Sequence, residues 1–338
     1  MSSFPPGDPS EPCPSCGVMM DVSHLDVFSL VGCPGCGSEV RVRTRLGSFL
    51  LTDLLARGGT GSVYRAVPLC GKLWARNPGF FGAIGLSWRS HREIALKVVG
   101  AAAADQGDEL ALLRNEERRV KNIRCERVVR ILSYEEDHEG ARMAMELMRG
   151  GSLHDMITAA KMLDENRLIT TALDVIEALD AFASEGMVHG DLKPANILFE
   201  ESGRAKLSDF GLARSLRRDD TPSLGLHATP DYVAPEVLDG GRGDFRSDLY
   251  GLGGCLHYGL TGRPPHATNG LGLEALREVK RRAAKIPPMR TDVSPDTITV
   301  VNRMLETDPE KRFQTPRESR QALLGAWNSM PASRRGQA

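Results

Sequence analysis

Acidic, amide and lysine side chains follow one another in this sequence in an order that suits chemistry on phosphate groups. A glycine-rich stretch at 58–63 is followed by Lys97, a lone cation in an apolar run. Further on, Asp191 and Asn196 flank a tight turn, and Asp209, in the run 207–211, offers a second carboxylate at the end of an expected strand. Glycine N–H groups can lie over phosphate oxygens, and carboxylate and amide oxygens are good ligands for Mg²⁺. The ordered set predicts magnesium-assisted phosphoryl transfer, with one acid as acceptor for the proton of the attacking hydroxyl.

Lys97 needs an anionic partner, because a buried and unpaired ammonium is costly. The polar helical stretch 108–123 offers three glutamates, Glu109, Glu116 and Glu117. Spacing to the next apolar run favours Glu116, and the other two remain alternatives.

Four cysteines form two near-identical Cys-x-x-Cys-Gly turns, Cys13 with Cys16 and Cys33 with Cys36, separated by residues 17–32. This spacing predicts a four-cysteine zinc site, with rubredoxin-like iron as the alternative. No ligand position is left open, so the metal would be structural and would supply the folding energy of a small ribbon. Acidic residues offset the basic ones nearby. We therefore expect a protein-interaction or spacer module and no nucleic-acid partner.

The composition is that of a soluble globular protein. Of the 338 residues, 41% are hydrophobic and 26% charged, and the net charge is −1. This balance excludes a disordered tail protein, and the chain has no overall basic field for nucleic acid or anionic lipid. No apolar run reaches the roughly 20 residues that span a bilayer, and the first residues lack the features of a secretory signal. We expect no membrane partner and a cytoplasmic location.

Hydrophobic patterning divides the chain into a strand-rich first part and a helix-rich second part, which predicts two lobes. Strand-like runs lie near 42–51, 94–99, 128–134 and 142–148, and apolar residues recur at helical spacing over 169–179. The segment 66–92 interrupts the first part and carries several aromatic residues. It is either an ordered flap or a docking element for a partner protein.

Three motifs follow the glycine-rich stretch and Lys97: Val-His-Gly-Asp-Leu-Lys-Pro-Ala-Asn at 188–196, Ser-Asp-Phe-Gly at 208–211 and Ala-Pro-Glu at 234–236. Together they make the chain resemble a eukaryotic-type protein kinase of the kind found in bacteria. The resemblance implies an α+β, bilobed kinase fold with a β-rich N-lobe and an α-helical C-lobe, preceded by the small zinc ribbon. The expected parts are a flexible N-terminus (1–12), the ribbon (13–45), the kinase domain (46–328; N-lobe 46–148 with the insertion 66–92, C-lobe 149–328) and a flexible tail (329–338).

The resemblance also implies ATP and Mg²⁺ as cofactors, with Mn²⁺ as a substitute, and assigns roles to individual residues. Lys97, oriented by Glu116, would hold the α- and β-phosphates, and Asp191 would position the substrate hydroxyl and accept its proton. Lys193 would touch the γ-phosphate, and a lysine at this place is typical of serine/threonine kinases. The residues expected to bind Mg²⁺ or to surround the nucleotide are Asn196 and Asp209 for the metal, Gly58, Gly59, Gly61, Val63 and Ala95 in the N-lobe, and Glu146 and Met148 at the hinge, with Met145 as gatekeeper.

Other motif residues would hold the fold. By the resemblance, Glu236 pairs with Arg312, Asp248 braces the catalytic loop, and Thr229 contacts the catalytic groups. We interpret His189 as a packing residue. The basic run 277–285 is interpreted as a solvated helix face, with docking of an acidic substrate as the alternative.

Three features depart from the family pattern without removing a catalytic group: two substitutions and the long insertion 66–92. Ala56 replaces the first glycine of the glycine-rich loop, and Gly190 replaces the arginine that precedes the catalytic aspartate. Because that arginine pairs with a phosphate on the activation segment, we expect Thr221 and Ser223 to matter little for activity.

The sequence therefore predicts a serine/threonine protein kinase that acts on protein hydroxyls. The alternative is a pseudokinase scaffold that binds ATP and engages partners through the ribbon. The presence of Lys97, Asp191, Asn196 and Asp209 together favours the enzyme, and the Ala-Pro-Glu segment favours protein over small-molecule substrates.

Overall fold

The computed structural model describes residues 10–22, 25, 27–58, 61–69, 93–100, 108–121, 123–137, 140–210, 214–215, 230–266, 268, 271–282, 286 and 292–335. The chain divides into two units, one formed by Met1–Glu117 and Arg130–Leu147, the other by Arg118–Val129 and Met148–Ala338. The predictions that lie outside the described residues concern Gly59, Thr221, Ser223, Thr229, residues 70–92 of the insertion and 283–285 of the basic run.

The first unit contains a six-stranded antiparallel sheet, in the order β5-β6-β7-β8-β10-β9. Its apolar face is a cluster that includes Phe49, Tyr64 and Leu96, all of them buried. The strand-rich first part predicted from the patterning is therefore present. The strands are β5 (Thr44–Leu46), β6 (Phe49–Gly58), β7 (Gly61–Pro68), β8 (Ile94–Gly100), β9 (Ile131–Asp137) and β10 (Gly140–Glu146).

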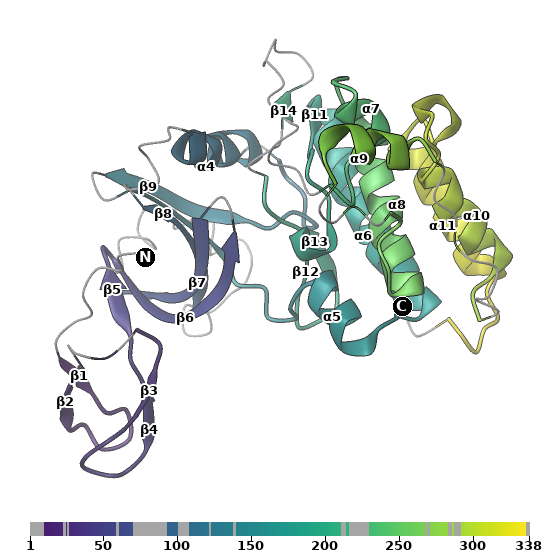
Figure 1. Cartoon of the computed structure of the whole chain (residues 1–338). Helices are drawn as coiled ribbons and strands as arrows, with labels where there is room; N and C mark the ends of the chain where they lie inside the picture. The colour runs from purple at the N-terminus through teal and green to yellow at the C-terminus, as the bar shows by residue number, and fades with distance from the viewer. Residues whose placement is uncertain are drawn as a thin grey trace. The chain divides into compact units, whose positions relative to one another are not determined.

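Helix α4 (Asp108–Val120) lies beside this sheet (Figure 1). Most of its residues are polar, but Leu113, Glu116 and Val120 are buried. Their spacing of three and four residues places them on one face of the helix. The buried stripe thus carries a carboxylate toward the sheet.

Two short hairpins form the ribbon ahead of the sheet, and its cysteines lie in their turns. The strands are β1 (Ser10–Pro12), β2 (Met19–Asp21), β3 (Leu30–Gly32) and β4 (Glu39–Arg41). The Phe28 ring lies 5.9 Å from that of Tyr64 on β7, and the Arg41 guanidinium lies 3.3 Å from the Asp53 carboxylate on β6. Phe28 has φ = 71°, which a bulky residue rarely adopts. The ribbon therefore packs on the sheet through an apolar contact and an ion pair.

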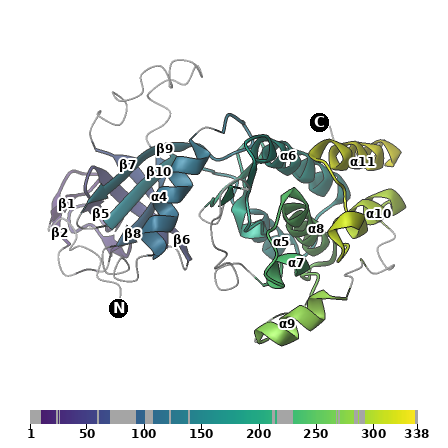
Figure 2. The same ribbon diagram turned by 90° about the horizontal axis from the view of Figure 1, so that it is seen from above.

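The second unit is mainly helical, as the patterning predicted. Helix α6 packs against α8 and α11, which in turn contacts α10 (Figure 2). Its elements are α5 (Leu153–Ala160), α6 (Glu165–Ser184), β11 (Met187–Val188), η1 (Pro194–Asn196), β12 (Ile197–Phe199), β13 (Ala205–Leu207), β14 (Arg214–Ser215), α7 (Pro235–Leu238), α8 (Phe245–Thr261), α9 (Leu273–Lys280), α10 (Pro295–Met304), η3 (Pro309–Lys311) and α11 (Pro316–Ser329).

Parts of the two ends that were predicted to be flexible, residues 10–12 and 329–335, are among those that the structure describes. Ser10–Pro12 pairs with β2, although 1–12 was expected to be flexible. In the expected flexible tail, Met330 is buried and the Arg334 side chain donates to the carbonyl oxygen of Asp292 at 2.6 Å. Backbone pairing and burial of an apolar side chain hold these segments in place. Among the helices that the structure describes, none combines the length and the apolar character needed to cross a bilayer.

Candidate active site

Lys97 on β8 contacts Glu116 on α4. Its Nζ lies 3.0 Å from Glu116 Oε2, and the two side chains are 7% and 1% exposed. Glu116, the partner that the spacing favoured, is thus in contact with the lysine. A buried ion pair of this kind fixes the ammonium at one place on the strand, because either charge alone would be costly there.

The glycine-rich stretch joins β6 to β7 as a hairpin, with Gly58 paired to Gly61. Gly61 has φ = 110°, and a Cβ placed there would lie 2.4 Å from the carbonyl oxygen of Val98. This position therefore requires glycine for both its conformation and its packing. On the neighbouring strands, Val63 pairs with Lys97 and Ala95 pairs with Arg65. The residues expected around a nucleotide thus share adjacent strands with the lysine.

The backbone beside the predicted hinge is tied to the edge of the same sheet. Glu146 N–H donates to the carbonyl oxygen of Arg130 at 3.0 Å, and Arg130 N–H donates to the Glu146 carboxylate at 2.8 Å. Met145, the predicted gatekeeper, is 9% exposed. Met148, the other predicted hinge residue, belongs to the second unit.

In the second unit, the turn from β11 to η1 brings Asp191, Lys193 and Asn196 together. Lys193 Nζ lies 2.6 Å from Asp191 Oδ2, and Asn196 Nδ2 donates to the Asp191 carbonyl oxygen at 2.8 Å and to Oδ2 at 3.3 Å. Asp191 is 8% exposed. Pro194 begins η1, which tightens the chain so that the amide reaches back to the carboxylate. The turn therefore presents one carboxylate with a cation and an amide at its side.

Asp248 on α8 holds this turn through two hydrogen bonds to its backbone. Its carboxylate accepts the N–H of His189 at 2.8 Å and that of Gly190 at 2.9 Å. His189 is completely buried, and its Nε2 lies 3.1 Å from the carbonyl oxygen of Ser208. These contacts agree with the predicted bracing and packing roles.

Asp209 follows β13 with φ = 62°, in the left-handed region that a non-glycine residue seldom occupies. The next residue, Phe210, is buried between two rings, 5.3 Å from Phe182 and 5.4 Å from His189. Burial of Phe210 holds the strained conformation at Asp209, and such strain is concentrated at functional sites.

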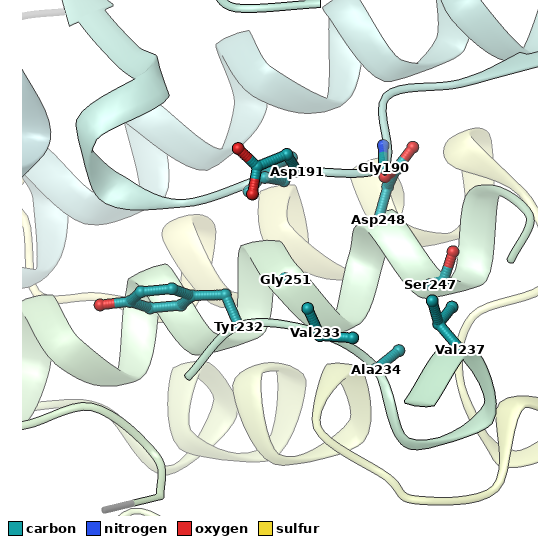
Figure 3. Close-up of a pocket in the computed structure, with 10 residues that line it drawn as sticks. Gly190, Asp191, Tyr232, Val233, Ala234, Val237, Ser247, Asp248 and Gly251 are labelled. Carbon is teal, nitrogen blue, oxygen red and sulfur yellow. Dashed lines mark hydrogen bonds between the residues drawn. The ribbon is translucent and has the colours of Figure 1, made fainter. Parts of the chain in front are cut away.

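A pocket opens beside Asp191 within the second unit. Asp191 lies on one side and the segment 232–234 on the other, with Gly251 of α8 between them (Figure 3). Leu192 also lines the pocket. Of the residues that line it, the sequence motifs indicated Asp191 and Ala234, but not Tyr232 and Val233. These residues carry no spacing signal, because only the packing of distant segments brings them together.

Glu236 and Arg312 form a bidentate ion pair behind this pocket, with N–O distances of 2.7 and 2.8 Å. Arg312 is completely buried. Its guanidinium also donates to the carbonyl oxygens of Glu306, Arg246 and Thr307.

We expect Glu236→Ala to lower the free energy of unfolding by about 3–5 kcal/mol, because it leaves the Arg312 charge buried without its carboxylate. Urea denaturation measures the change. The control is Glu310→Ala, which removes the exposed partner of Arg246 and should cost under about 1 kcal/mol. Equal losses in the two variants would contradict the prediction.

The four cysteines of the ribbon come together as the sequence predicted. Their sulfur atoms all lie within 4.8 Å of one another, and two of the cysteines are buried. The two turns match: Gly17 N–H donates to the Cys13 carbonyl oxygen, and Gly37 N–H to that of Cys33, both at 2.8 Å. Both glycines have positive φ, 76° and 72°. The cluster has the donor number and softness that suit one tetrahedral metal ion.

Comparison with known proteins agrees with this arrangement. The model of the protein kinase domain matches residues 79–324, which is more than half of the chain but begins after the glycine-rich stretch. The chain is 31% identical over 245 residues to the serine/threonine-protein kinase PknB of Mycolicibacterium smegmatis, covering 70% of this chain and 39% of that protein. It is 29% identical over 300 residues to the serine/threonine-protein kinase pkn2 of Myxococcus xanthus, covering 85% and 33%.

A probable serine/threonine-protein kinase of Streptomyces coelicolor is 26% identical over 292 residues, covering 84% of this chain and 41% of that protein. The chain thus spans about two fifths or less of the length of these relatives. Its sheet-rich and helix-rich units correspond to the N-lobe and C-lobe that the resemblance implied. With the domain model matched across more than half of the chain, the chain belongs to the protein kinase family.

Proposed function

We propose that this protein is a serine/threonine kinase that transfers the γ-phosphate of Mg·ATP to hydroxyl groups of proteins. The observation that carries the proposal is the arrangement of Asp191 with Lys193 and Asn196 on one turn. A carboxylate there can accept the proton of a hydroxyl, and the lysine beside it can neutralise charge on the transferred group. The lysine contact also supports Ser/Thr specificity, in keeping with the names of the relatives.

The residues present fit ATP and Mg²⁺. Asn196 and Asp209 offer hard oxygen ligands for Mg²⁺, and Lys97 is held by Glu116 as a fixed cation for phosphates. A side chain on Gly61 would collide with the neighbouring strand, so the hairpin keeps a bare backbone for phosphate oxygens. Bound Mg²⁺ would supply neutralisation of the charge that develops on the phosphate oxygens.

In the proposed reaction, Asp191 orients the substrate hydroxyl and accepts its proton as the oxygen attacks the γ-phosphorus. The bond from this phosphorus to the β,γ-bridging oxygen of ATP breaks, and ADP leaves. Lys193 stabilises the negative charge on the transferred group. Asp248 keeps the turn in place through the two N–H groups that it accepts. The segment 232–234, across the pocket from Asp191, would contact the substrate chain.

The first test is transfer of labelled γ-phosphate from Mg·ATP to the protein itself and to a generic basic protein. Transfer to serine and threonine alone would support the proposal. ATP binding without transfer would favour the scaffold, and transfer to tyrosine would overturn the Ser/Thr assignment.

We also propose that the four ribbon cysteines bind one structural zinc ion, with iron as the alternative. We place the protein in the reducing cytoplasm, where paired Cys-x-x-Cys motifs more often bind metal than form disulfides. The ribbon and the 66–92 insertion are the proposed places for a partner protein.

We expect activity to be nearly independent of phosphorylation at Thr221 and Ser223. Gly190 has no side chain to pair with an activation-segment phosphate, so the double variant Thr221→Ala/Ser223→Ala should keep its rate of transfer within about threefold of the wild type. Initial rates after phosphatase treatment provide a second readout. A transfer rate in the double variant that is tenfold or more below the wild-type rate would contradict this prediction.

A further inference from the structure

Lys280, the last residue of α9, is a buried cation with no place in the chemistry described above. It is completely buried, which is rare for lysine. Its Nζ lies 2.6 Å from the carbonyl oxygen of Asp231 and 5.2 Å from the centre of the Tyr250 ring. Burial lowers the pKa of Lys280 to about 7, while the Asp231 carboxylate opposes the shift. Removing an ammonium group from water costs free energy, so the contacts of Lys280 must compensate for this desolvation.

Lys280 binds the carbonyl oxygen of the residue that precedes the segment 232–234, which we call the pocket wall. Asp231 immediately precedes Tyr232, the first residue of the segment 232–234 beside Asp191. The Asp231 carboxylate in turn accepts the hydroxyl of Thr268. Both the backbone and the side chain of Asp231 are therefore fixed by hydrogen bonds. These contacts also fix the position of the first residue of the pocket wall.

The same helix also holds the far end of this segment. Arg277 donates to the carbonyl oxygen of Leu238 from Nε at 3.1 Å and from Nη2 at 3.0 Å, and it lies 3.4 Å from the Asp239 carboxylate. Arg277 and Lys280 are three residues apart, so they project from one face of α9. Together they clamp the segment 231–238 at both ends.

We propose that Lys280 is a positioning residue for the protein substrate, which it serves by holding the pocket wall at its correct distance from Asp191. The proposal rests on the kinase function proposed above. Among the pocket-lining residues that the structure describes, none is a proposed ligand of ATP or Mg²⁺. Loss of the clamp should therefore weaken recognition of the protein substrate and leave nucleotide binding unchanged.

The test compares Lys280→Met with Arg282→Met, which makes a similar change at a side chain that is 79% exposed. A hydrogen bond to a charged group contributes about 1.5–3 kcal/mol, so we expect KM for a generic basic protein to rise about tenfold or more in Lys280→Met. KM for ATP and kcat at saturating protein should stay within about twofold of the wild type. Arg282→Met should match the wild type, and Lys280→Arg should recover most of the loss.

Hydrogen exchange of the full chain provides a readout that needs no activity. Amides of 231–238 should exchange faster in Lys280→Met but not in Arg282→Met. If Lys280→Met does not fold, Arg277→Met, which loosens the other end of the clamp at a partly exposed residue, should raise the same KM.

Unchanged KM for the protein substrate in a folded variant, or an equal rise in both KM values, would overturn the proposal. Wild-type protein that transfers no phosphate would instead refute the kinase function, and the substrate role with it. In that case faster exchange at 231–238 would still establish the clamp.

Discussion

Replacing Asp191 by asparagine should lower kcat for phosphoryl transfer by about 10²–10⁴-fold, the usual contribution of a positioned acid or base. The amide has nearly the same shape as the carboxylate but cannot accept the proton of the substrate hydroxyl. Lys193 and Asn196, which contact the Asp191 carboxylate, remain to fill the site. We therefore expect ATP affinity to change little. Single-turnover transfer and calorimetric titration with Mg·ATP measure the two quantities separately.

Two further variants show whether the loss is specific to the catalytic group. Asp180→Asn makes the same change at an exposed position of α6 and should keep the wild-type rate. Lys97→Met should also abolish transfer, but through the fixed cation that Glu116 holds. An Asp191→Asn enzyme within tenfold of the wild type would show that another group accepts the proton.

The second large effect is expected at the ribbon. If the cysteine cluster binds zinc as proposed, Cys33→Ser should eliminate metal binding and unfold the ribbon, because structural zinc sites contribute about 10–16 kcal/mol of apparent binding energy to folding. The sheet has its own apolar cluster and should remain folded, although it loses the contact between Phe28 and Tyr64. Metal content by mass spectrometry and hydrogen exchange of 10–42 are the measurements.

Cys125→Ser is the matched control, since Cys125 lies outside the cluster. Its thiol donates to the Glu177 carbonyl oxygen at 3.8 Å and accepts the Arg127 N–H at 3.4 Å, two weak hydrogen bonds that a serine hydroxyl can replace. This variant should keep one zinc ion per chain. Wild-type protein purified with iron would select the rubredoxin-like alternative. A metal-free wild type with a folded ribbon would refute the site altogether.

The turn at Asp191 and the cysteine cluster were predictable because their residues lie close together in the chain. Asp191, Lys193 and Asn196 fall within six residues, and each Cys-x-x-Cys-Gly turn is closed by its own backbone hydrogen bonds. Local backbone geometry then settles where the side chains go, and residue type and spacing carry that information. The contact of Lys97 with Glu116 was also predictable, because a buried cation requires a nearby acid and few were available.

Other features required the assembled fold. Nothing in the local sequence marks Phe28 as the residue that seats the ribbon on β7, or Lys280 as a buried cation at the pocket wall. The basic run was interpreted as a solvated helix face, yet its Lys280 points inward while Arg282 is exposed. Both residues are basic side chains in the same run, so the sequence does not show which of them is buried. Only the packing of α9 against distant segments distinguishes the buried residue from the exposed one. Residue types thus determine which chemistry is available, whereas burial, and with it the role of each charge, is decided by contacts between parts of the chain that are far apart in sequence.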